Sequence, residues 1–132
     1  MKDDRAIYLL FGLELESKIH YAMPVRNMLY DAMNYDQQVH KIAAIHHNNK
    51  STKKLNSSEF LSGFLKEDHL IPVITLTVNI SGDRWDGATN IHEMFDIKDN
   101  LLLKFIPNYH INLFQIRLMI MNLTDFILEL VR

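Results

Sequence analysis

Glu14 and Glu16 stand one residue apart in a largely apolar stretch, and their type and spacing suit chemistry better than any other pair. In a β-strand, side chains two positions apart project from the same face, with Cα atoms about 6.6–7 Å apart. A strand that presents two neighbouring acids has either a metal ion to hold or a cation to meet. Mg²⁺ suits such a pair, because it prefers carboxylate oxygens and needs only one or two acids from the protein.

The strand that positions the acids is predicted over Ala6–Glu16, where apolar and mixed residues alternate. One face carries Ile7, Leu9, Phe11, Leu13 and Leu15, and the other carries Tyr8, Leu10, Gly12, Glu14, Glu16 and Lys18. Both acids therefore point the same way, with Lys18 on their side.

A helix is predicted to begin near Pro24 and to run to about His46, because Pro suits the first turn and apolar residues recur at helical spacing. That stripe comprises Val25, Met28, Leu29, Ala32, Val39, Ile42 and Ala43. Arg26 falls in the first turn, where a cation opposes the helix dipole by about 0.3–1 kcal/mol. Either the two acids or a bound phosphate would offset this cost, and a solvated Arg26 is the simpler alternative.

The remaining chain predicts an alternation of short elements and therefore a mixed α/β or α+β fold, with a small central sheet flanked by helices in a single domain over 1–132. The elements expected are a helix over Glu59–Leu65, a strand over Leu70–Ile80, a short helix from Thr89 or Asn90 to Phe95, strands over Leu101–Ile106 and Tyr109–Leu113, and a helix over Phe114–Arg132.

Composition excludes several classes of function. The 14 Lys and Arg nearly balance the 16 Asp and Glu, so a nucleic-acid site would have to be a local patch. Because cysteine is absent, disulfides, thiolate metal sites and a Cys nucleophile are excluded, which fits a cytoplasmic protein. The apolar C-terminal segment is interrupted by polar residues, so we expect a soluble protein with no membrane partner.

Other chemistries find little support. The seven histidines form no HExxH pattern, and the glycines form neither GxGxxG nor GxxxxGK. A basic linker contains Lys50, Lys53 and Lys54, which would lie along a phosphate backbone. A plain flexible loop is the alternative, because no aromatic residue is interleaved for base stacking.

Two blocks carry a resemblance to a known family: GLELESKIHYAMPVRNMLYDAMNYDQQV at 12–39 and LSGFLKEDHLIPVITLTVNISGDRWDGATNIHEMF at 61–95. In order and spacing they resemble the recombination-promoting nuclease and putative transposase family, which belongs to the PD-(D/E)XK nuclease superfamily. The resemblance covers about half of the chain. It implies Mg²⁺-dependent DNA cleavage in recombination, on a core ordered helix, strand, strand, strand, helix, strand.

The resemblance also implies roles for single residues. Glu14 matches the metal-binding acid, and Glu16 occupies the Gln or Lys position, where it would act as base or further ligand. Lys18 would substitute electrostatically for the missing donor, and Arg26 would face the DNA phosphate. The family's Asp on a preceding strand has no counterpart other than Asp3 and Asp4 in a turn-like segment. We therefore expect an incomplete core, truncated at its N-terminus.

Two functions remain open at this stage. The first is a DNA endonuclease related to transposases, impaired by truncation. The second is a non-catalytic DNA- or protein-binding remnant, which the altered position 16 and the missing Asp favour. The apolar C-terminal helix, which nothing in the sequence obviously covers, is a third feature of this second function. A homo-oligomer or a missing N-terminal segment is a further expected partner.

Overall fold

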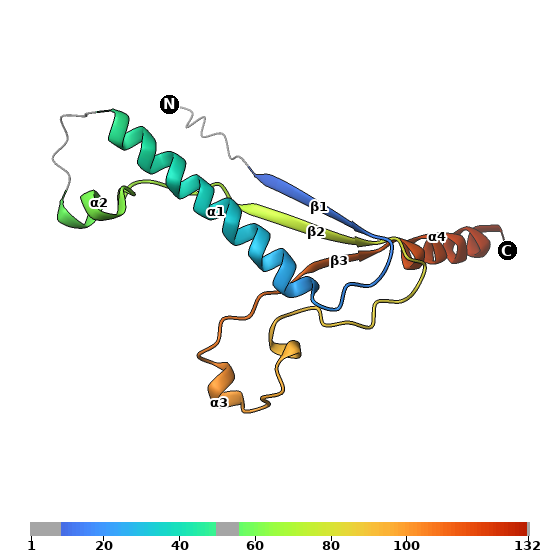
Figure 1. The fold of residues 1–132 in the computed structure, drawn as a ribbon. Helices are drawn as coiled ribbons and strands as arrows, with labels where there is room; N and C mark the ends of the chain where they lie inside the picture. The colour runs from blue at the N-terminus through green and yellow to red at the C-terminus, as the bar shows by residue number, and fades with distance from the viewer. Residues whose placement is uncertain (1–8, 50–55, 132) are drawn as a thin grey trace. The chain divides into compact units, whose positions relative to one another are not determined.

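The computed structural model describes residues 9–49 and 56–131 (Figure 1). In chain order its elements are β1 (Leu10–Glu16), α1 (Met23–Asn48), α2 (Ser57–Ser62), β2 (Val73–Asn79), the 3₁₀ turn η1 (His92–Met94), α3 (Asn100–Leu103), β3 (Asn112–Gln115) and α4 (Ile116–Val131). The mixed α+β class and the small sheet are confirmed. None of the described helices combines the length and the apolarity needed to cross a bilayer.

The three strands form one sheet in the order β1-β2-β3. Strand β2 pairs with β3 in parallel, with Leu76 opposite Asn112 and Val78 opposite Phe114. The amide of Leu10 donates to Pro72 O at one end of β1, and that of Ile80 donates to Glu16 O at the other, so β1 and β2 run in the same direction as well. A parallel pair needs a long crossover, which here contains α1 and α2.

The chain forms two compact units. The first contains the described residues of Met1–Leu10 and Leu29–Ile74, and the second contains Phe11–Met28 and the described residues of Thr75–Arg132. The acids, Arg26 and most of the sheet belong to the second unit.

Hydrogen bonds from α1 to the chain that enters β2 hold the first unit. Gln38 accepts from the amide of Ile71 at 2.7 Å and donates to its carbonyl at 3.0 Å, and the Tyr35 hydroxyl accepts from the amide of Val73. Asp68 accepts from the Leu65 amide and pairs with His46 Nε2, both at 2.7 Å. Burial alone would raise the pKa of Asp68, but these two partners outweigh it and lower that pKa below its usual value.

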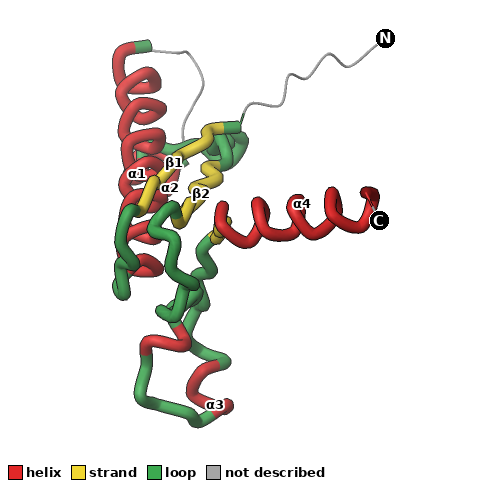
Figure 2. The backbone as a smooth tube through the Cα atoms, turned by 90° about the vertical axis from the view of Figure 1, so that its right-hand side faces the viewer, coloured by secondary structure: helices red, strands yellow, loops and turns green. Residues whose placement is uncertain are grey.

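The apolar core of the second unit is small. It consists of Met23, Trp85 and Ile111, with Ile19, Tyr109 and Leu113 packed partly buried against it. Trp85 is held at the sheet because its amide donates to Gln115 Oε1 at 2.9 Å. The connection from β2 to β3 is mostly loop, with α3 as a short helix within it (Figure 2).

The sheet of this unit buries its polar side. A Cβ on Gly12 would lie 3.1 Å from Thr75 Oγ1, so Gly12, Glu14 and Glu16 share the face of Thr75, Thr77 and Asn79. We call this the polar sheet face; its β2 residues are buried and its two acids half-buried. The opposite, apolar sheet face carries Phe11, Leu13 and Leu15 of β1, Leu76 and Val78 of β2, and Phe114 of β3, with the exposed Asn112 beside Leu76.

The first turns of α1 also differ from the predicted stripe. Val25 and Met28 are exposed, whereas Met23, Pro24 and Asn27 are buried. The helix bounds were predicted to within two residues, but its N-terminal contact is with a polar strand face, so the buried positions include an amide.

One predicted element near the C-terminus was wrong, and another is displaced along the chain. The strand expected over Leu101–Ile106 is instead the helix α3, because Asp99 caps it by accepting from the amide of Leu101 at 2.8 Å. The strand expected over Tyr109–Leu113 begins at Asn112 and continues to Gln115. Helix α4 then starts at the next residue, close to its predicted start.

Candidate functional site: an acid pair bridged by Arg26

Strand β1 brings Glu14 and Glu16 to the same side, as predicted. The neighbouring Leu13 and Leu15 are 62% and 59% exposed on the other face, whereas the carboxylate side chains retain 20% and 14% of their exposure. Both acids therefore lie on the covered side of the sheet, within reach of the first turns of α1.

Arg26 of α1 lies between the two acids. Its Nη2 is 3.2 Å from Glu14 Oε2, and its Nη1 is 3.6 Å from Glu16 Oε1. One guanidinium thus meets two carboxylates, which uses the planar fork of arginine. Two questions left open by the sequence receive the same answer: the cation that the acids meet is Arg26, and the anions that offset its place in the helix are Glu14 and Glu16.

The donor chemistry of this pair fits a hard divalent ion. Mg²⁺ takes carboxylate oxygens and completes its octahedron with water, so two acids are sufficient. The described residues contain no group of three or more His, Cys, Asp or Glu side chains arranged for a metal. A metal held by Glu14 and Glu16 would also have to displace the guanidinium of Arg26 or share the carboxylates with it.

Lys18 does not lie on the strand face with the acids. Strand β1 ends at Glu16, and Lys18 lies in the bend that follows, with its side chain exposed. The alternation of faces holds only while the backbone stays extended, so the strand pattern does not reach Lys18 and its role beside the acids stays a prediction.

The other predicted site residues fall outside the part of the chain that the structure describes. These are Lys50, Lys53 and Lys54 of the basic linker, and the candidate acids Asp3 and Asp4. The expected contacts of that linker with DNA stay predictions.

A buried polar pair beside the acids was missed by the sequence analysis. Asn27 follows Arg26 in α1, and its Nδ2 donates to Thr77 Oγ1 at 2.6 Å, with both residues fully buried. The second amide atom of Asn27, Oδ1, has no hydrogen-bond partner among the described atoms. The pattern Thr-x-Thr-x-Asn over 75–79 was the available signal, since it places a polar row on one strand face.

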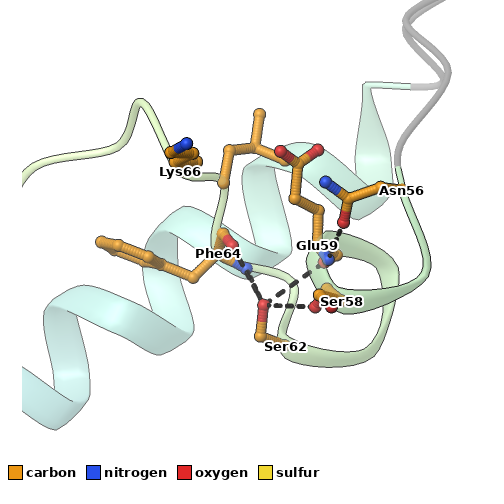
Figure 3. A pocket seen from close by; sticks show the side chains of 7 residues that line it. Asn56, Ser58, Glu59, Ser62, Phe64 and Lys66 are labelled. Carbon is orange, nitrogen blue, oxygen red and sulfur yellow. Dashed lines mark hydrogen bonds between the residues drawn. The ribbon is translucent and has the colours of Figure 1, made fainter.

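The first unit has a separate hollow of about 340 Å³ around α2 (Figure 3). Its lining hydrogen bonds are local: Asn56 caps the helix by accepting from the Glu59 amide, and the Ser62 hydroxyl donates to Ser58 O. These bonds shape the turn that ends at Gly63. Because these bonds are local caps and turns, the hollow is weaker than the acid pair as a candidate site.

Comparison of the chain with protein-family models, curated proteins and solved structures finds no match. The family relationship therefore stays a proposal, which depends on the two sequence blocks and on the acid pair itself.

Proposed function

We propose that this chain derives from a Mg²⁺-dependent DNA endonuclease of the PD-(D/E)XK type, related to recombination-promoting nucleases and putative transposases. The observation that carries the proposal is the acid pair: two half-buried carboxylates on one strand face, next to the N-terminal turn of α1. The order strand, helix, strand from β1 to β2 agrees with the corresponding part of the expected core.

In the proposed reaction, Glu14 and Glu16 would hold the metal ion. When bound, Mg²⁺ would polarise the scissile phosphoryl oxygen and lower the pKa of the attacking water. Glu16, the acid at the position where the family carries Gln or Lys, would serve as a further ligand or as the base that takes a proton from that water. The extended backbone of β1 keeps both carboxylates on one side throughout.

Arg26 is the residue that faces the DNA phosphate in this proposal. Its guanidinium lies 3.2 and 3.6 Å from the two carboxylates, and the same planar fork of donors suits a phosphate oxygen. Lys50, Lys53 and Lys54 would add contacts to the DNA backbone. Since the whole chain has a net charge of −2, such contacts must be local.

A second candidate function is a non-catalytic DNA- or protein-binding remnant. The observation that favours it is the same guanidinium, because Arg26 alone satisfies both acids and leaves them no need of a metal. In that case the acid–arginine cluster is a structural ion pair between β1 and the start of α1.

A plasmid-nicking assay over a Mg²⁺ titration separates the two. Nicking that rises with Mg²⁺, is lost in Glu14→Gln and is kept in Glu67→Gln supports the endonuclease; Glu67 is an exposed acid outside the site. Absence of nicking by the unmodified chain would overturn catalysis. Calorimetric titration with Mg²⁺ then tests the second candidate function. A remnant binds no Mg²⁺ at the acid pair, so the unmodified chain and Glu14→Gln should give the same heat.

A further inference from the structure

The side chains of the apolar sheet face, defined above, are much more exposed to solvent than side chains in a protein interior. Phe11, Leu13 and Leu15 are 66%, 62% and 59% exposed, and Phe114 on β3 is 44% exposed. Apolar side chains clustered on one surface commonly mark an interaction site. This face is continuous across all three strands of the second unit, so it is a surface that a whole secondary-structure element can cover.

Helix α4 carries a second exposed apolar surface. Leu123, Ile127, Leu130 and Val131 recur at i, i+4, i+7 and i+8, and they are 58%, 49%, 70% and 80% exposed. We call these four residues the α4 ridge. Asn122, Asp125 and Glu129 lie on the opposite side of the helix, so α4 is amphipathic and one side of it needs cover.

The connection between the two surfaces prevents them from meeting within one chain. Strand β3 ends at Gln115 and α4 begins at Ile116, with no residue between them (Figure 1). A helix that folds back over its own strand needs a connection that reverses the chain, and such connections take about 2–6 residues. The dimensions otherwise match, since 16 helical residues span about 24 Å and seven strand residues about 23 Å.

We propose that the occupant of the apolar sheet face is the α4 ridge of a second copy of this chain, in a reciprocal two-fold dimer. Each copy places its α4 on the sheet of the other, so every exposed apolar surface named above becomes covered. The direct β3–α4 junction keeps each helix extended toward its partner. An interface of this kind is isologous, because both copies use the same two surfaces.

The area available agrees with reciprocal rather than one-way docking. The ten apolar side chains of the two surfaces, about half-exposed on average, present on the order of 300–600 Å² per copy at about 60–120 Å² for a whole side chain. A stable interface buries about 800 Å² per partner, so the apolar part alone supplies roughly half of this area when both helices dock, and the polar rim supplies the rest. One-way docking would bury about half as much.

This dimer does not depend on the proposed nuclease function. Glu14 and Glu16 lie on the polar sheet face, opposite the docked helix, so the acid pair is not part of the interface. Loss of dimerisation and loss of Mg²⁺ binding are therefore measured separately.

The molar mass of the full chain in solution, by size exclusion with light scattering, tests the dimer. We expect the unmodified chain to be dimeric at micromolar concentrations, Ile127→Lys to shift to monomer, and Glu129→Lys, on the polar side of α4, to stay dimeric. Leu13→Glu on the sheet face should also give monomer. Circular dichroism checks that each variant remains folded.

Two outcomes would overturn the proposal. One is a monomeric unmodified chain at 100 μM, and the other is a dimer that survives Ile127→Lys.

Mixing the variants tests reciprocity. When Ile127→Lys chains are mixed with Leu13→Glu chains, a heterodimer has one unmodified docking site and one site at which the new lysine meets the new glutamate. The heterodimer should therefore form at least tenfold more than either homodimer.

Because the chain has no cysteine, Leu13→Cys and Leu130→Cys chains can also be mixed and cross-linked without background. We expect a disulfide that joins position 13 of one chain to position 130 of another. Formation of the same disulfide within a single chain that carries both substitutions would overturn the dimer proposal.

Discussion

At the scale of single residues, Arg26 decides how the acid pair behaves. It contributes a positive charge between Glu14 and Glu16, so under the proposed function its guanidinium would compete with Mg²⁺ for the two carboxylates. Partly exposed ion pairs are worth about 0.2–1 kcal/mol, so Arg26→Gln should tighten Mg²⁺ binding about two- to fivefold in calorimetry. The exposed Arg84 gives a control, since Arg84→Gln should leave the affinity unchanged. Weaker binding by Arg26→Gln would contradict this competition.

The buried pair of Asn27 and Thr77 makes a second prediction. Thr77→Val removes the partner of an amide that is fully buried, which should lower the free energy of unfolding by about 1–3 kcal/mol in urea. Replacing both partners with apolar groups of similar shape is close to neutral, so Asn27→Leu combined with Thr77→Val should recover most of the loss. If the double variant is less stable than Thr77→Val alone, the Asn27 side chain must have a polar partner besides Thr77.

Asp68 makes the stability of the first unit depend on pH. Its pKa is lowered in the folded chain by the Leu65 amide and His46, so its contribution is present above the unfolded value of about 3.9 and is lost as pH falls through the folded pKa. The difference in unfolding free energy between the unmodified chain and Asp68→Asn should therefore shrink as pH falls below about 4. Urea unfolding at pH 6, 4 and 3 measures it, and a difference that stays constant would exclude this role.

At the scale of elements, alternation predicted which residues share a face but not which face is covered. The pattern of β1 fixed Glu14 and Glu16 on one side and Leu13 and Leu15 on the other, and both assignments hold. Hydrophobicity alone would bury the leucines, whereas α1 covers the acids. That choice depends on tertiary pairing, here Arg26 with the acids and Asn27 with Thr77, which no local pattern contains.

The type of an element, helix or strand, was predictable where the periodic segment is long. It was poorly predictable where the segment is short. Helix α1 and strand β2 match their predictions to within a few residues, because each repeats its pattern over several turns or pleats. The four residues of α3 form barely one turn, and the capping bond from Asp99 outweighs the strand preference of the apolar run that follows.

The end of α2 is fixed by a glycine that no other residue can replace without cost. Gly63 has φ 67°, and a Cβ there would lie 2.8 Å from the Cβ of Ala43. Gly82 has φ 82°, and a Cβ added there would meet nothing within 4 Å, so Gly82→Ala isolates the backbone cost of about 1–2 kcal/mol. Gly63→Ala adds overpacking of about 1–3 kcal/mol and should be the less stable variant in urea unfolding. Equal losses of unfolding free energy in Gly63→Ala and Gly82→Ala would show that Ala43 moves aside without cost.

At the scale of the whole molecule, the apolar surface left outside is large and the core inside is small. Among the described side chains, the buried apolar residues are Met23, Trp85, Ile91 and Ile111, whereas most of the large apolar side chains on the sheet and α4 are exposed. A fold with so little interior should draw stability from association, and mass action then makes its melting temperature depend on concentration. We expect Tm to rise by about 2–5 °C for a tenfold increase in protein concentration. Ile127→Lys should abolish this dependence and lower Tm, whereas Glu129→Lys should keep it. A Tm that is independent of concentration for the unmodified chain would mean that its stability is internal to one copy.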